Sequence, residues 1–248
     1  MVDGGNRSSG DMRGLLVLVV FGVSCRWANA GLAPYITPCH ASDSECLKTS
    51  AQKAVPFLAP GIPELGMKSL DPMHIELVRA DQAGLKVEFR KTVVKGLRNC
   101  VILSMKRHGK KQSIELKCSV VLVGDYTIGG RLLILPVEGE GKYRIKIRDL
   151  IVTVKYDVGE KIMDGDVYWT LPKWTHSTEL QGGAEFQFQN LFNGNKQLSD
   201  AVHQFANQNW KDIFQEVAPP IVREIVTAIV LEVSKFFTKV PLKELALD

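Results

Sequence analysis

The chain has 248 residues, with 31 basic and 27 acidic side chains and a formal net charge of +4 at pH 7. So weak a positive charge argues against a nucleic acid or another polyanion as partner. The length suits one β-rich domain or two small ones, and no low-complexity linker interrupts residues 74–240.

Residues 1–30 have the pattern of a secretory signal peptide. A short apolar run follows Arg7 and Arg13, and Ala28-Asn29-Ala30 fits the small-x-small rule for a cleavage site. The run is about ten residues long, short of the roughly 20 that span a bilayer. We therefore expect a mature domain of residues 31–248 that is secreted, extracellular and without a transmembrane segment.

Four of the five cysteines remain in the mature domain, and an oxidising compartment favours their pairing. Three sets of pairs are possible, and Cys39–Cys46 is favoured because it closes a short loop. Cys100 and Cys118 each stand nine residues from Gly109, the expected centre of a hairpin turn, so they should face each other across two strands. A bulge would spoil that register, and two reduced, buried cysteines are the alternative.

A short helix is expected next. Ser42-Asp43-Ser44-Glu45 matches a capping box, and apolar residues follow at helical spacing as far as Leu58. Pro56 and Pro60 should keep this helix short and bent.

Short strands are expected almost without a break from about residue 74, because apolar and polar residues alternate as in a sheet with one dry and one wet face. The alternation is clearest over residues 114–122. Its parity changes between Tyr143 and Val158, which predicts a bulge near Asp149-Leu150. Such a bulge would bend the strand and let the sheet wrap a helix.

Residues 198–240 predict a long amphipathic helix, kinked or broken at Pro219-Pro220. A continuous rod of this length would reach roughly 60 Å, so we expect an elongated domain. Core packing explains most of its apolar stripe, and periodicity alone leaves open whether the rest lines a cavity.

The sequence carries no recognisable catalytic apparatus. Its five histidines are scattered without metal-binding spacing, and no nucleophile or nucleotide-binding motif occurs. We therefore expect neither an enzyme nor a bound metal or cofactor, and the alternative is a lipid-ester hydrolase, which the missing nucleophile motif argues against. The basic hairpin tip at residues 106–111 and the basic side chains Arg144, Lys146 and Arg148 are interpreted as solubilising charges, with membrane docking or an anionic ligand as the alternative.

Several apolar and aromatic residues could line a ligand site, although a packed core explains them equally well. Tyr156 differs, because its hydroxyl follows two valines on a dry strand face and needs a partner. That partner could be a ligand, a buried water or a backbone carbonyl. The candidate ligand-binding residues are Tyr156, Val154, Trp169, Phe188, Val202, Phe205 and Ile213.

A set of short motifs follows in order along the chain. They are Cys39 and Cys46, Gly61-Ile62-Pro63-Glu64-Leu65-Gly66, Asp71-Pro72, Gly124-Asp125-Tyr126, Leu132-Leu133-Ile134-Leu135-Pro136, Gly139-Glu140-Gly141, Leu191-Phe192-Asn193-Gly194-Asn195-Lys196, Asn209-Trp210 and Lys239-Val240-Pro241. In these motifs the chain resembles the takeout / juvenile-hormone-binding-protein family of arthropods over essentially the whole mature domain. The pair Cys100/Cys118 differs from the second disulfide expected of the hormone-binding branch, so the resemblance is to the wider family.

The resemblance implies an α+β fold, in which a long C-terminal α-helix is wrapped by a highly curved antiparallel β-sheet. This is the tubular lipid-binding architecture, an elongated single domain with an internal apolar tunnel. In hormone-binding relatives a sesquiterpenoid is held by apolar contacts and a tyrosine hydroxyl, a role that would fall to Tyr156. The resemblance also connects the chain with circadian rhythm and with transport.

These observations predict a secreted carrier for a small hydrophobic molecule, such as a terpenoid hormone, a fatty acid or a chemosensory compound. Release would require one end of the tunnel to open, with the N-terminal helix as the candidate gate. The alternative is a non-enzymatic signalling protein with a filled core and no ligand, acting through an unidentified protein receptor.

Overall fold

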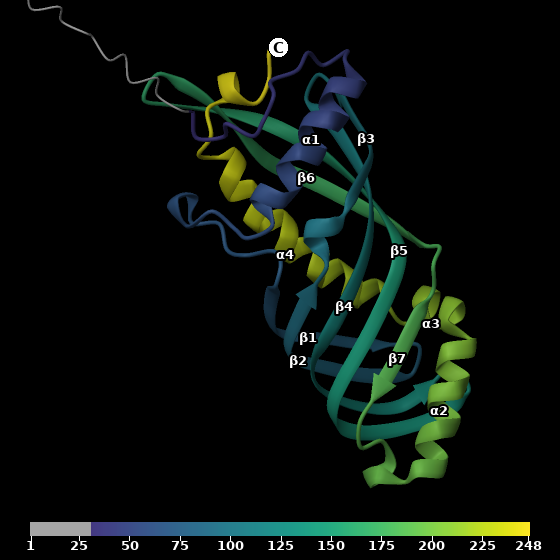
Figure 1. Ribbon diagram of the computed structural model, residues 1–248. Helices are drawn as coiled ribbons and strands as arrows, with labels where there is room; N and C mark the ends of the chain where they lie inside the picture. Colours follow the sequence, from purple (N-terminus) through teal and green to yellow (C-terminus); the bar gives the residue numbers. More distant parts are fainter. Residues whose placement is uncertain (1–30) are drawn as a thin grey trace, which may run out of the picture. The chain divides into compact units, whose positions relative to one another are not determined.

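The computed structural model describes residues 31–248, and the expected signal peptide lies outside them. The described part is an α+β unit, as expected, in which one antiparallel sheet curves around C-terminal helices (Figure 1). Its strands are β1 (Met73–Gln82), β2 (Leu85–Lys95), β3 (Val101–His108), β4 (Lys111–Leu132), β5 (Leu135–Met163), β6 (Asp166–Leu180) and β7 (Ala184–Phe188). The sheet order is β1-β2-β4-β5-β6, while β3 pairs with β4 and β7 pairs with β5.

The expectation of short strands is wrong. β4 has 22 residues and β5 has 29, so these two strands run through the whole sheet. Bulges bend long strands without ending them, and in sequence a bulge looks like the end of a strand. The predicted bulge is present: Cys118 pairs with Leu150 whereas Val120 pairs with Ile147, and Asp149 has φ +49°.

The C-terminal segment forms three helices rather than one long rod: α2 (Lys196–Gln208), α3 (Trp210–Glu216) and α4 (Pro219–Phe237). Pro219 and Pro220 occupy the first turn of α4, where a missing N–H costs nothing, so the predicted break falls just before them. The break at Asn209 was not predicted. There the Asn209 side chain donates to the Phe205 carbonyl at 2.8 Å.

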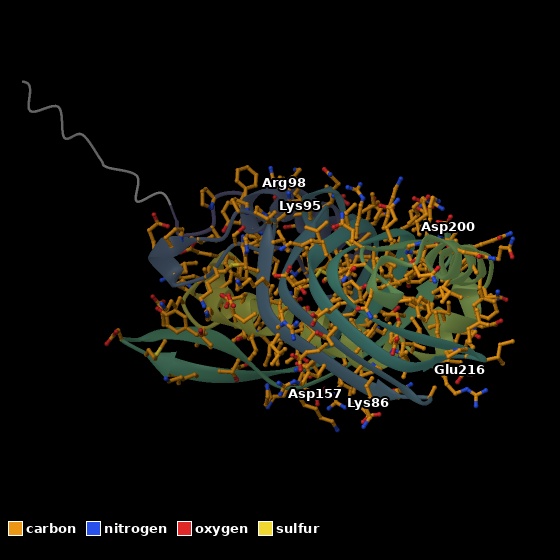
Figure 2. All side chains as sticks on the ribbon, turned by 90° about the horizontal axis from the view of Figure 1, so that it is seen from below. Lys86, Lys95, Arg98, Asp157, Asp200 and Glu216 are labelled. Atoms are coloured by element: carbon orange, nitrogen blue, oxygen red, sulfur yellow. A yellow bond between two sulfur atoms is a disulfide. The ribbon has the colours of Figure 1, made fainter. Side chains whose placement is uncertain are left out.

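α4 lies along the hollow side of the sheet and contacts both edge strands, β1 and β6, so the sheet curves around it. Figure 2 shows the strands arching across this helix. α2 packs against β7, and α1 (Ser44–Leu58) packs against β3. α1 begins one residue later than the expected capping box, because the Asp43 side chain, and not that of Ser42, accepts the N–H of Cys46 at 2.9 Å.

Four short 3₁₀ segments complete the described part of the chain: η1 (Pro63–Leu65), η2 (Leu97–Asn99), η3 (Phe192–Gly194) and η4 (Leu242–Glu244). The two expected disulfides, Cys39–Cys46 and Cys100–Cys118, are both formed.

One basic residue of the β3–β4 hairpin is not the solubilising charge that the sequence suggested. Arg107 is only 4% exposed. Its guanidinium lies 5.5 Å from the centre of the Trp169 ring and donates to Oδ1 of Asp248 at 2.6 Å. The strand alternation turns this side chain inward, where the carboxylate compensates its charge.

Candidate ligand cavity

A cavity of about 200 Å³ lies between the hollow face of the sheet and helices α3 and α4. Its walls come from β2, β4, β5, β7, the two helices and Leu97, and every lining residue is apolar. A comparable apolar cavity of about 150 Å³ stays dry and takes up benzene or xenon. This space therefore suits hydrocarbon and offers water no partner.

The bulge in β5 produces this uniform lining. Ile145 and Ile147 face the cavity before the bulge, and Leu150 and Val152 face it afterwards. Without the extra residue the second half of the strand would turn its polar side chains inward, because successive side chains alternate between faces. The change of parity in the sequence is thus what keeps the part of the wall formed by β5 apolar.

Two tyrosines near the cavity have their hydroxyls occupied by protein atoms. Tyr126 donates to the Gln189 carbonyl at 2.6 Å, and the Tyr143 hydroxyl lies 2.8 Å from Oγ1 of Thr92. Burial raises the pKa of each tyrosine to about 12, so both remain protonated at neutral pH. Neither residue lines the cavity.

Tyr156 does not line this cavity. It belongs to a second apolar cluster with Trp169 and Phe236, and its hydroxyl donates to Oε1 of Gln112 at 3.1 Å. Its partner is thus a side-chain amide, which is none of the three partners expected from the sequence. Burial raises the pKa of Tyr156, and the buried Nε2 of Gln112 has no hydrogen-bond partner among the described residues.

The structure brings together three of the seven candidate ligand residues. Val154, Phe188 and Ile213 line the cavity. Val202 is buried and Phe205 half-buried on α2, which packs against β7 and contributes nothing to the lining, and Trp169 stays with Tyr156 in the second cluster.

Sequence reasoning did not single out the largest part of the lining. This part comes mainly from β4, β5, α4 and β2, as Leu122, Ile145, Ile225, Val87 and Phe89 illustrate. Their helical and alternating spacing was the signal that marks them as inward-facing.

A family model described as "Haemolymph juvenile hormone binding protein (JHBP)" matches residues 15–247 of the chain. The protein belongs to this family. This match confirms the resemblance found in the sequence motifs. The family consists of non-enzymatic binding proteins that carry hydrophobic ligands.

Relatives of known name agree with this membership. The Circadian clock-controlled protein daywake of Drosophila melanogaster is 28% identical over 238 residues, covering 90% of this chain and 91% of the relative. Daywake of Drosophila yakuba is 26% identical over 210 residues, covering 78% and 80%. The crystal structure of Epiphyas postvittana Takeout 1 matches with a TM-score of 0.84 and 30% identity, over 86% of this chain and 100% of that one.

No helix within residues 31–248 is long and apolar enough to cross a membrane. In the same range no group of three or more histidine, cysteine, aspartate or glutamate side chains is arranged to hold a metal ion.

Proposed function

We propose that residues 1–30 direct secretion and that residues 31–248 act outside the cell as a carrier for a small hydrophobic molecule, held in the apolar cavity. Family membership supports the carrier role, and two disulfides fit an extracellular site. Val154, Phe188 and Ile213 contact the ligand in this proposal.

The observation that carries the proposal is the unfilled apolar space. At roughly 24 cal/mol per Å³, an empty cavity of about 200 Å³ would cost on the order of 5 kcal/mol of stability. That cost is as large as the whole free energy of unfolding of many domains. A hydrocarbon ligand would offset it, and a signalling protein with a filled core would have no such space.

The lining also narrows the ligand class. A polar group placed inside the cavity would lose its water and find no hydrogen-bond partner, at a cost of roughly 1–3 kcal/mol. The ligand is therefore mainly hydrocarbon, such as the chain of a fatty acid or a terpenoid. Any ester, epoxide or carboxylate it carries lies outside the lining described here.

Native mass spectrometry of the secreted protein after gentle purification tests the proposal. A carrier retains an apolar small molecule, and solvent extraction removes the extra mass. Protein that carries no extra mass, and that also fails to take up the hydrocarbon fluorophore diphenylhexatriene, would contradict the proposal.

A further inference from the structure

A second hollow lies on the outside of the molecule, beside the place where α3 meets α4. It measures about 360 Å³ and runs between the end of β6 and these two helices. Helices α3 and α4 are neighbours in Figure 1. Unlike the cavity, it has a mixed lining. Its polar residues are Thr178, Glu179, Lys211 and Gln215, and its apolar ones include Leu180 and Trp210.

Two side chains belong to the walls of both spaces. Phe214, on the last turn of α3, and Val222, on the first turns of α4, line the inner cavity and also this outer groove. Both are half-buried. These two side chains, the gate pair, thus lie where the groove and the apolar cavity adjoin.

The backbone at this place is suited to movement. Only Val217 and Ala218 separate α3 from α4, and Pro219 and Pro220 supply no N–H to tie the two helices together. The carbonyl of Glu216, labelled in Figure 2, accepts a hydrogen bond from the Gln82 side chain at 2.6 Å. A helical joint held by a side chain from the sheet edge can bend at lower cost than a continuous helix.

We propose that the ligand enters and leaves through this groove, between Phe214 and Val222. The inference rests on the proposed carrier function and adds its route. The aromatic ring turns aside to join groove and cavity, and the polar rim around Lys211 receives any polar end that the apolar interior excludes.

The N-terminal helix, the gate expected from sequence, is less well placed. None of its residues lines the cavity, and its main contacts are with β3 and η2. An opening there would have to displace η2, whose Leu97 lines the cavity, whereas the gate pair lines both the groove and the cavity.

Site-specific blocking tests the route. The four cysteines of the described residues are all in disulfides, so a single introduced thiol can be labelled selectively. Lys211→Cys places a bulky maleimide at the groove, and Lys53→Cys places the same group on exposed α1. Stopped-flow fluorescence then follows diphenylhexatriene binding to each labelled protein.

The label at position 211 should slow association and dissociation together, and the label at 53 should leave both unchanged. Slowing by the label at 53 alone, or by neither label, would overturn the proposal. Failure of unlabelled protein to bind the probe at all would instead contradict the carrier function.

Removing the gate ring provides an independent measurement. Phe214→Ala should raise the association rate constant roughly tenfold, as a barrier lowered by about 1.4 kcal/mol gives. It should raise the dissociation rate constant by more than this, because Phe214 also lines the cavity. Phe188→Ala is the matched control, because it deletes an aromatic ring that lines the cavity away from the groove. In that variant only the dissociation rate should change, and equal behaviour of the two variants would count against a gate at Phe214.

Discussion

Asn207 pairs with the backbone of Phe186 through both ends of its side-chain amide. Oδ1 accepts the Phe186 N–H at 2.7 Å, and Nδ2 donates to the Phe186 carbonyl at 3.3 Å. One helical turn earlier, His203 accepts the N–H of Phe188 at 2.9 Å. Helix α2 thus takes the place of a neighbouring strand along β7 and holds two cavity-lining phenylalanines in position.

Asn207→Ala should therefore weaken both folding and binding. Losing two hydrogen bonds at a partly exposed site should lower the free energy of unfolding by about 1–2 kcal/mol, measured by urea denaturation. Affinity for diphenylhexatriene should fall as Phe186 becomes free to move. Gln208→Ala, at the next exposed position, is the control, and equal losses in the two variants would show that the pairing is irrelevant.

The bond from Phe188 to His203 should make stability depend on pH. Burial lowers the pKa of His203, although Asp200 opposes this, and only the neutral ring can accept the bond. Below about pH 6.5 the unfolded chain takes up a proton that the folded state resists, so the free energy of unfolding should fall between pH 7 and pH 5.

The variant His203→Gln should reduce that slope while keeping stability at pH 7, because the glutamine carbonyl can accept the same N–H. His203→Ala should reduce the slope and also cost about 1 kcal/mol at pH 7. Urea titrations at three pH values measure both effects. A slope as steep in both variants as in the parent protein would rule out His203 as its source.

Replacing Cys100 and Cys118 together by alanine should lower the free energy of unfolding by about 3 kcal/mol, from the entropy of a loop with 18 residues of separation. Ligand affinity should change as well, because Cys118 lines the cavity. The corresponding change at Cys39 and Cys46 should cost about 2.5 kcal/mol and leave affinity intact. Affinity that responds equally to both changes would contradict this assignment.

The sequence predicted the Cys100–Cys118 pair correctly but for an incomplete reason. The hairpin turn is Gly109-Lys110, with His108 opposite Lys111, so its centre lies after Gly109 rather than on it. A bulge between Ile102 and Ser104 then shifts the register by one residue and brings the two cysteines opposite each other. The bulge expected to spoil the pairing is what produces it, and symmetry about a turn cannot reveal a compensating irregularity.

Alternation was more informative about β5 than about the ligand residues. A change of parity records directly which way each side chain points, so the bulge at Asp149 could be predicted. Whether an inward side chain meets protein or empty space depends on where the helices lie. The break at Asn209 carries α2 to β7, and for that reason Val202 and Phe205 do not line the cavity.

Filling the cavity from both sides should separate stability from binding. Val152 on β5 and Val226 on α4 both line the space. Changing each to phenylalanine replaces an isopropyl group by a benzyl group, so ligand-free protein should gain about 1–2 kcal/mol as empty volume disappears. Diphenylhexatriene should then bind at least about tenfold more weakly, a loss of about 1.4 kcal/mol.

Leu231→Phe is the control, because it adds a ring to α4 at a site 59% exposed, and it should change neither stability nor probe affinity. Unchanged probe affinity in the doubly filled variant would mean that hydrocarbon binds elsewhere, because a space already occupied by two rings cannot hold the probe as before.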